Sequence, residues 1–427
     1  MVFMAKVRII LLSLLTLLFC SCERDGLDLT LNIGPMGEET RKVMLLDEAG
    51  FNSLGGDISN NIAQLSDGYL PEKGRSEDVL LVFSHVTKKY RDYAVETAPA
   101  LFRLYSERGK VRSDTLRVWP VGTPIANAGV MTDVFNWVKE EFPAAGYGAV
   151  LSSHATGWLP EDYYNNCKKY EGSNRGGSIT WSPQLRSYGQ EYYSSGTKTQ
   201  EMEIRELAAA IPYKLDYILF DACLMATVEV AWELRNVCSY LAVSPCEIPA
   251  AGFNYRTMAE HLLKPDVPDL KAVCQDYFAT YENDNVYGAT ITMVDCGRLD
   301  RLASTCRTLF DRYRSDIRTL TGKNVQAYDR RVGSKLYYAF FDLKDILREA
   351  GAADGDLALL QEALDEALVY EAHTNRFIEV KLDRCCGLSM YLPSYPDYKR
   401  DIYHGTEFLD GFYKENIAWN QATGLVE

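Results

Sequence analysis

From residue 42 to about residue 244, short apolar runs alternate with segments whose apolar residues recur at the period of a helix. Short runs of apolar and β-branched residues are typical of buried strands, whereas the helical period is typical of amphipathic helices. The predicted strands are 42–46, 78–83, 114–119, 147–154, 215–223 and 240–244. The predicted helices run through Ile58, Ile62 and Leu65 after a cap at Asn52 or Ser53, and through 126–142, 201–211 and 224–236.

Strands separated by helices favour βαβ units with right-handed crossovers. We therefore expect an α/β fold with a mainly parallel sheet flanked by helices. The pattern is less regular in the C-terminal half of the chain. There it predicts helices at 267–283, 298–320 and 356–372, and strands at 287–294 and 387–392. This half is expected to form a helix-rich part that packs on the first sheet.

Two of the predicted strands end in a chemically reactive side chain. His154 follows the apolar run that begins at Tyr147, and Cys223 follows the run that begins at Leu215. Because parallel strands of an open α/β sheet present their carboxyl ends at one edge, the imidazole and the thiol would meet there. A cysteine nucleophile and its general base require that arrangement. The alternatives are a small buried hydrophobe at Cys223 and a structural role for His154.

The residues beside Cys223 add two expectations. The helix predicted to start at Leu224 would direct its N-terminal dipole at Cys223 and stabilise the thiolate. Asp221 lies two residues earlier, so on a strand both side chains share one face, and the carboxylate can line a pocket beside the thiol. Asp221 can also serve as the cap of the helix that follows.

Between residues 159 and 199 the pattern dissolves into a segment rich in Tyr, Asn, Gly and Ser. A segment of that length without regular structure is typical of a functional or processed loop. The alternative is a loop that is merely mobile. Its basic residues are Lys168, Lys169, Arg175, Arg186 and Lys198.

The composition restricts the partners. Among the 427 residues, 47% are hydrophobic and 24% are charged, which is typical of a globular protein. The formal net charge of −14 argues against nucleic acid, because a phosphate backbone requires clustered Lys and Arg. The same charge weakly favours cationic substrates. We expect a monomer.

The N-terminus has the pattern of an export signal. Two basic residues precede the apolar run Ile9–Phe19, which is short for a membrane span. The end of the run resembles the lipobox of Bacteroides-type exported lipoproteins, in which Cys22 would carry the lipid. This implies a signal peptide over 1–22, a linker over 23–40, and an anchor in the outer membrane or at the cell surface, with the periplasmic side as the alternative. The alternative is an ordinary secretory peptide with an incidental cysteine.

The cysteines do not indicate a metal site. Of the eleven cysteines, Cys20 and Cys22 belong to the export signal, which leaves an odd number at irregular spacings. There is no CxxC pair and no HExxH motif, and the adjacent Cys385 and Cys386 cannot easily share one zinc ion. We expect neither a metal nor another cofactor. If the remaining cysteines form bridges within the chain, at least one is unpaired, and Cys223 is the natural candidate.

The segments around both reactive residues resemble the clostripain family of cysteine peptidases, within the larger group that contains caspases, legumains and gingipains. The matching segments are His154 with Gly157-Trp158, Asp221-Ala222-Cys223-Leu224-Met225-Ala226-Thr227 with Glu229 and Glu233, Val43–Leu54, Ser244–Phe253, Gly387–Pro393 and Phe412–Trp419. The resemblance covers roughly residues 40–420, and its most specific part is the Asp-Ala-Cys-Leu-Met-Ala block. It implies a caspase-like catalytic domain over 41–255, completed by 256–427.

The resemblance also implies a mechanism, that of an endopeptidase with a Cys-His dyad. Cys223 would be the nucleophile and His154 the acid–base group, and the backbone N–H groups of Cys223 and Ala155 would bind the oxyanion. Asp221 would lie at the base of the specificity pocket and select Arg or Lys. A recessed carboxylate is satisfied by a guanidinium group and rejects acidic or apolar side chains. The implied partners are therefore peptides or proteins that contain Arg or Lys.

Related enzymes mature by cutting themselves after a basic residue. The resemblance therefore implies self-cleavage in the loop 159–199, at Lys168 or Lys169. Some relatives need calcium, but the sequence contains no contiguous acidic loop with the spacing of calcium ligands.

One residue departs from the family pattern. Ala155 stands where the family commonly has Gly, and it keeps the N–H donor unless the turn requires a positive φ. Two other functions stay open at this point. One is a catalytically silent, surface-anchored binding protein of the same fold, and the other is an amidase that acts on non-peptide amides.

Overall fold

The computed structural model describes residues 40–74, 76–90, 93–160, 188–192, 199–284, 286–329, 339–393 and 405–427. Residues 39–427 form one compact unit. The predicted signal peptide, Cys22 and most of the loop 159–199, with Lys168 and Lys169, lie outside the described residues.

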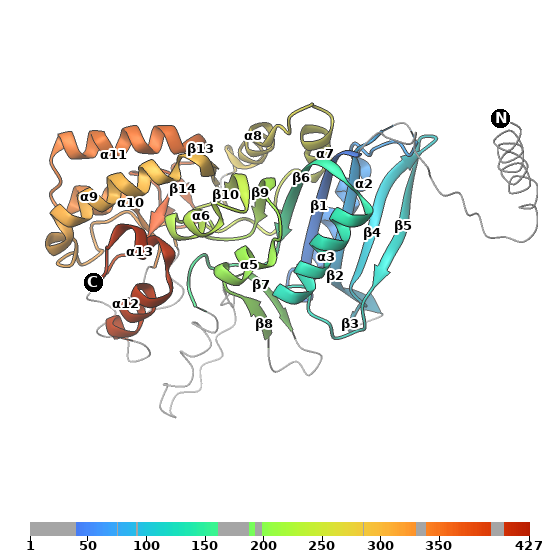
Figure 1. The fold of residues 1–427 in the computed structure, drawn as a ribbon, viewed down its shortest axis with the longest axis horizontal. Coiled ribbons are helices and arrows are strands. Elements are labelled where there is room, and N and C mark those ends of the chain that lie inside the picture. Colours follow the sequence, from blue (N-terminus) through green and yellow to red (C-terminus); the bar gives the residue numbers. More distant parts are fainter. Residues whose placement is uncertain are drawn as a thin grey trace, which may run out of the picture. The chain divides into compact units, whose positions relative to one another are not determined.

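One ten-stranded sheet runs through the molecule (Figure 1). Its strands are β1 (Thr40–Gly50), β2 (Val79–Tyr90), β3 (Tyr93–Glu96), β4 (Ala100–Glu107), β5 (Lys110–Val118), β6 (Ala144–Ser152), β9 (Leu215–Asp221), β10 (Cys238–Val243), β11 (Thr290–Asp295) and β13 (Leu368–His373). Their order is β13-β11-β10-β9-β6-β1-β2-β4-β5, and β3 pairs with β2. The central strands β2, β1, β6, β9 and β10 are parallel, and the strands outside them pair antiparallel.

The central strands are those that the apolar runs predict. Val43–Leu46 of β1 and Leu80–Phe83 of β2 are buried, as expected for parallel strands covered on both faces. The predicted strand 114–119 overlaps β5, but β5 is a largely exposed edge strand that pairs antiparallel with β4. The sequence pattern missed β3 and β4. The mainly parallel core of the sheet is confirmed.

Helices cover both faces of the sheet, each above its own apolar cluster. One face carries α2 (Gly55–Asp67), α7 (Tyr255–Leu263) and α8 (Leu270–Tyr281). The other cluster includes α3 (Ala128–Glu141), α5 (Ile204–Ala210), α6 (Val228–Leu234), α9 (Leu299–Ile317), α10 (Leu343–Glu349), α11 (Asp354–Ala367), α12 (Gly405–Asn416) and α13 (Ala418–Thr423). The short elements are β7 (Tyr188–Tyr192), β8 (Thr199–Met202), η2 (Cys296–Arg298), β12 (Phe341–Asp342), β14 (Arg376–Phe377), β15 (Val380–Lys381) and β16 (Ser389–Met390).

The C-terminal half contributes strands as well as helices to this architecture. β11 and β13 extend the same sheet, and α9, α10 and α11 gather beside β13 (Figure 1). The predicted helix 356–372 is wrong over its last residues, because α11 ends at Ala367 and β13 occupies 368–373. The predicted cap of α2 at Asn52 or Ser53 is also wrong, since the N-cap residue is Leu54.

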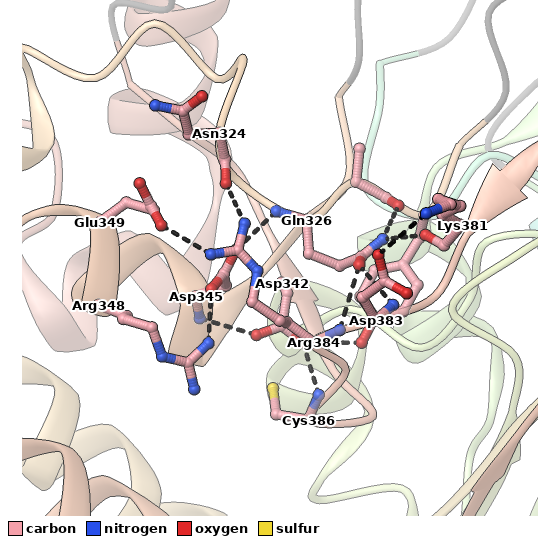
Figure 2. Close-up of polar contacts among 12 residues, drawn as sticks. Asn324, Gln326, Asp342, Asp345, Arg348, Glu349, Lys381, Asp383, Arg384 and Cys386 are labelled. Carbon is pink, nitrogen blue, oxygen red and sulfur yellow. Dashed lines mark hydrogen bonds and ion pairs between the residues drawn. The ribbon is translucent and has the colours of Figure 1, made fainter. Parts of the chain in front are cut away.

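A cluster of polar side chains beside β12 and β16 holds the segment that precedes β16 (Figure 2). The Asp342 carboxylate accepts a hydrogen bond from the Cys386 N–H at 2.6 Å. The Gln326 side-chain oxygen accepts one from the Arg384 N–H at 3.3 Å, and the Arg384 guanidinium donates to Glu349 at 2.7 Å. This cluster therefore holds the residues just before β16.

Candidate active site

The predicted meeting of two strand ends is present in the structure. β6 and β9 are neighbours and parallel, with Ser152 opposite Asp221 in the register. The Ser153 N–H donates to the Asp221 carbonyl oxygen at 3.3 Å, so the two chains stay side by side beyond the ladder. His154 and Cys223 follow directly and line the same pocket, whose volume is about 610 Å³.

The pocket is acidic. Its walls come from the start of α2, the ends of β6 and β9, the segment after β10, and the β14 region. The lining residues are Ser53, Leu54, Asp57, Ile58, Asn61, Ser152, Ser153, His154, Asp221, Ala222, Cys223, Glu247, Ile248, Pro249, Ala250, Tyr287, Phe377 and Ile378. Three carboxylates belong to this described lining, and Lys and Arg do not occur in it. Such a cavity favours a cationic group.

His154 is held by a side chain that the sequence pattern did not assign to the site. The ring is nine-tenths buried, and its Nε2 atom lies 2.9 Å from the Ser53 hydroxyl oxygen. Ser53 follows β1, the neighbour of β6 on its other side. This hydrogen bond fixes the orientation of the imidazole ring in the pocket that it lines.

The surroundings of Cys223 correct one expectation. The thiol is partly exposed and forms no disulfide. The helix predicted to start at Leu224 begins only at Val228, so its dipole is not directed at Cys223. Instead, the Ile248 N–H donates to Sγ at a distance of 3.4 Å. A backbone donor of that kind favours the thiolate without a helix.

The turn after Cys223 is strained, which explains why the helix starts late. Leu224 has a φ of 61°, a left-handed conformation that is costly for a side chain of this size. Tertiary contacts hold it there, because its N–H donates to the Cys246 carbonyl oxygen at 3.0 Å and its side chain is buried. The Ser389 N–H of β16 donates to the Ala226 carbonyl oxygen at 2.9 Å and supports the same turn.

The turn after His154 packs directly against the turn after Cys223. Gly157 has a φ of 58°, and a Cβ atom added there would lie 2.6 Å from the Leu224 carbonyl oxygen. Only glycine allows both the left-handed conformation and this approach of two backbones. Gly157 thus sets the separation between the two turns.

Replacing Gly157 with alanine is expected to lower the free energy of unfolding by about 2 kcal/mol, because the Cβ atom meets backbone and the left-handed φ is disfavoured. Catalytic turnover should fall as well, since the two turns are forced apart. Denaturant unfolding and turnover of the variant test this. The matched control is Gly355→Ala in α11, where a Cβ atom would meet nothing within 4 Å. Equal stability of the two variants would contradict the prediction.

Asp221 lies on the floor of the pocket and is buried. Its carboxylate accepts a hydrogen bond from the Tyr255 hydroxyl at 2.6 Å and another from the Phe253 N–H. Burial raises the pKa of Asp221 to about 6, and these hydrogen bonds lower it only in part. The expectation that Asp221 caps the next helix is wrong, because Thr227 is the N-cap of α6 and accepts from the Val230 N–H.

Glu48 adds a second buried carboxylate to this floor. Glu48, Ser152 and Asp221 lie opposite one another on adjacent strands, which places them in one row on one face of the sheet. Glu48 is fully buried, and the neighbouring Ser152 hydroxyl stabilises its carboxylate only in part. Its pKa is raised by burial and, further, by the nearby Asp221 and Asp47. The raised pKa favours the protonated form of Glu48, so the negative charge beneath the pocket rests on Asp221.

Ala155 keeps an ordinary backbone conformation. It is not among the described residues with positive φ, so this turn does not require the Gly that the family commonly has. Ala155 forms an isolated antiparallel bridge with Tyr188 of β7. The bond that joins the two segments runs from the Gly189 N–H to the His154 carbonyl oxygen at 3.0 Å, so the Ala155 N–H is not its donor.

β7 is fixed in turn by a buried charged cluster. The Glu191 carboxylate lies 2.5 Å from His85 Nδ1 and accepts a hydrogen bond from the Ala126 N–H at 2.9 Å. The other nitrogen of His85 lies 3.2 Å from Glu96. The segment that returns from the loop is therefore anchored to β2 and β3, and through the bond from Gly189 it supports the His154 turn.

Other features of the described residues do not form a second reactive centre. A larger pocket of about 870 Å³ lies around Gln326 and Arg384, but the Arg384 guanidinium is already bound to Glu349 and Asp345 (Figure 2). No group of three or more His, Cys, Asp and Glu side chains in the described ranges is arranged to hold a metal ion. The described helices include none with the length and hydrophobicity of a membrane span.

Sequence reasoning placed His154, Cys223 and Asp221 in one pocket, and it missed Glu48, Ser53 and Ile248. Glu48 and Ser53 lie in the segment Val43–Leu54, which resembles the family, but the sequence pattern assigns Glu48 to no element and Ser53 only to a helix cap. Once β1 is placed beside β6, Glu48 lies in register with Ser152 and Asp221, and that position identifies it as a residue of the site.

Comparison with known proteins gives one family and a set of similar folds. The model of the clostripain family matches residues 49–423. An X-ray structure of an inactive zymogen C11 protease from Parabacteroides distasonis aligns with a TM-score of 0.70 and 27% identity, over 90% of this chain and 98% of that chain. No curated protein matches the chain.

A second similar structure is that of a secreted C11 cysteine protease from Bacteroides thetaiotaomicron, solved with an irreversible peptide inhibitor. It aligns with a TM-score of 0.68 and 22% identity, over 90% of this chain and 99% of that chain. The caspase-like α/β fold expected from the sequence is confirmed by these structures.

Proposed function

The chain belongs to the clostripain family of cysteine peptidases, and we propose that it is an endopeptidase that cleaves after Arg or Lys by a Cys223–His154 dyad. The observation that carries this proposal is the acidic pocket that His154 and Cys223 both line. Family membership makes it a hydrolase of peptide bonds. It does not favour a silent binding protein or an amidase.

In the proposed mechanism, Cys223 Sγ attacks the carbonyl carbon of the scissile bond. His154 accepts the thiol proton and then donates it to the leaving amine. Water hydrolyses the resulting thioester by the same route. The N–H groups of Cys223 and Ala155 stabilise the oxyanion, and Ile248 supports the thiolate before attack. These groups supply the whole reaction, so the proposal includes no cofactor.

The specificity follows from charge. A guanidinium or ammonium group that enters the pocket meets Asp221 on the floor, with Glu48 behind it and Asp57 and Glu247 on the walls. A charge-assisted bond to a buried carboxylate is strong, whereas an acidic or neutral side chain leaves the pocket carboxylates unpaired. We therefore expect discrimination by substrate charge at this position.

A panel of fluorogenic peptides that differ only in the residue before the scissile bond tests the proposal. Arg and Lys peptides should be cleaved, while norleucine, citrulline and Glu peptides should be cleaved at least about 100-fold more slowly. Equal turnover of Arg and citrulline peptides would contradict the specificity. Failure to cleave any peptide, in reduced and processed protein, would overturn the peptidase assignment and return a silent binding protein to consideration.

We also propose that Ser53 orients His154. Ser53→Ala is expected to lower kcat about 10- to 100-fold with little change in KM, because the imidazole ring loses the hydroxyl that holds its orientation. Steady-state kinetics across pH test this, and the acid limb of kcat should shift with the variant. Ser53→Thr, which keeps the hydroxyl, should retain most of the activity. Unchanged kcat in the alanine variant would contradict the role.

Two further proposals concern residues outside the described ranges. The first is self-cleavage after Lys168 or Lys169, which the basic specificity of the pocket would allow. The second is export, with a lipid on Cys22 as the anchor. A C11 relative is described as secreted. Metabolic labelling with a clickable fatty acid, with Cys22→Ser as the control, distinguishes a lipid anchor from a cleaved secretory peptide.

A further inference from the structure

Two buried cysteines meet at the end of the sheet strands opposite to the pocket. Cys238 is the first residue of β10, and Cys296 is the first residue of η2, directly after β11. β10 and β11 are antiparallel neighbours, with Tyr240 opposite Asp295 in the register. The start of one strand therefore lies beside the end of the other, and the Cys238 and Cys296 sulfurs are 3.6 Å apart.

We propose that Cys238 and Cys296 form a disulfide when the protein folds in an oxidising environment. The two sulfurs are already in contact, because the Cys238 side chain at the start of β10 meets that of Cys296 just beyond the end of β11. Shortening the sulfur–sulfur distance from contact to a covalent bond needs only a small rotation of the side chains. Both residues lie in the apolar core, where a disulfide is readily accommodated.

The chemistry is a two-electron oxidation of two thiols by a disulfide-containing oxidant, such as glutathione disulfide or an exchange catalyst. One thiolate attacks a sulfur of the oxidant and releases a thiol, and the second cysteine then displaces the other thiol from the mixed disulfide. The two cysteines lose two protons and two electrons, and the oxidant becomes two thiols. No metal or other cofactor takes part.

Burial decides when this reaction occurs. Cys238 is fully buried, and its pKa is raised by burial and further by the neighbouring Cys296. The thiolate needed for exchange therefore hardly forms in the folded protein. The bond would form while β10 and β11 pair, before the core closes over them, and it would then resist reduction.

The disulfide would be a covalent cross-link between the two halves of the chain. The bond closes a loop of 58 residues and joins the sheet to the start of α9. The opposite end of β10 leads into the pocket wall at 247–250. The disulfide would therefore lie at the end of β10 that is remote from the pocket. Oxidation should therefore change stability and leave catalysis unaltered.

The experiment is to unfold the reduced protein and refold it with and without glutathione disulfide. A brief treatment with a mild thiol then regenerates the partly exposed Cys223. Peptide mapping without reduction should find the peptides of Cys238 and Cys296 cross-linked. The melting temperature should rise by about 5 °C on oxidation. Turnover of a substrate peptide, normalised to the amount of reduced Cys223, should stay the same.

Three variants make the outcome decisive. Cys238→Ala and Cys296→Ala should each lose the cross-link and the rise in melting temperature. Cys306→Ala, at a buried cysteine of α9, should keep both. Quantitative alkylation of Cys238 and Cys296 in denaturant, without prior reduction of the oxidised sample, would overturn the proposal. So would an equal rise in melting temperature in Cys238→Ala. Neither result depends on the peptidase activity.

Discussion

Turnover of peptides with Arg or Lys before the scissile bond is expected to fall at least about 10⁴-fold when Cys223 is replaced by alanine. The proposed reaction passes through a thioester on this sulfur, and the described pocket offers no other thiol at that position. The backbone N–H groups proposed to bind the oxyanion and the His154 ring are still present in the variant, so a small residual rate is expected. The measurement is kcat/KM on a fluorogenic Arg peptide.

The same variant separates self-cleavage from digestion by a contaminating protease. Wild-type protein should be purified as two fragments, while Cys223→Ala should be purified as one chain that the active enzyme cuts when it is added. Cys274→Ala, at a buried cysteine of α8, is the matched control and should behave as the wild type. Two fragments from both wild type and Cys223→Ala would rule out self-processing, although the peptidase reaction itself could still hold.

The second large effect is expected at Asp221. Asp221→Asn should lower kcat/KM for Arg and Lys peptides about 10³-fold, because it removes the buried carboxylate that pairs with the substrate cation. Asparagine has the same shape and can still accept the hydrogen bond from the Tyr255 hydroxyl. The loss should appear mainly in KM, and the rate with a norleucine peptide should change little or rise.

The pKa of Asp221 adds a pH signature to this prediction. Burial raises that pKa to about 6, so the free enzyme carries a neutral Asp221 below this pH and an ionised one above it. Only the ionised form pairs with a guanidinium, so KM of the wild type should rise as the pH falls below about 6. Asp221→Asn should lack this limb, and a KM limb that persists in the variant would contradict its assignment to Asp221.

Stability provides the control for misfolding. A carboxyl group whose pKa is raised in the folded state contributes stability below its unfolded pKa, and this contribution is lost as the pH rises through the folded pKa. At pH 8 the ionised Asp221 is therefore a cost, and Asp221→Asn should unfold at the same temperature as the wild type or at a higher one. A marked fall in its melting temperature would mean that the lost activity reflects structure.

The parallel core of the sheet and the turns that carry His154 and Cys223 were predictable because they depend on local sequence patterns. A strand buried on both faces is a continuous apolar run, and its abrupt end at His154 or Asp221 is visible without any tertiary information. The position of both runs in neighbouring strands was an expectation from fold class, and it is confirmed by the β6–β9 ladder.

The parts that could not be predicted depend on contacts between distant segments. Leu224 favours a helix by local propensity, but its N–H is taken by Cys246 and its carbonyl oxygen packs on Gly157, so the helix starts only at Val228. The run 368–373 follows a helical pattern without a break, yet its pairing with β11 makes it a strand. Tertiary structure overrides propensity at both places.

The contacts that anchor β7 determine what a cut in the chain between Pro160 and Tyr188 would produce. The residues up to Pro160 are fixed by the sheet through β6, and those from Tyr188 are fixed by His85 and by the bond to the His154 turn. Each end therefore has its own contacts with described parts of the fold. A cut in this stretch would turn the molecule into a heterodimer whose central subunit interface is the β6–β9 ladder. The reactive imidazole would come from one subunit and the thiol from the other, so neither product would be an enzyme by itself.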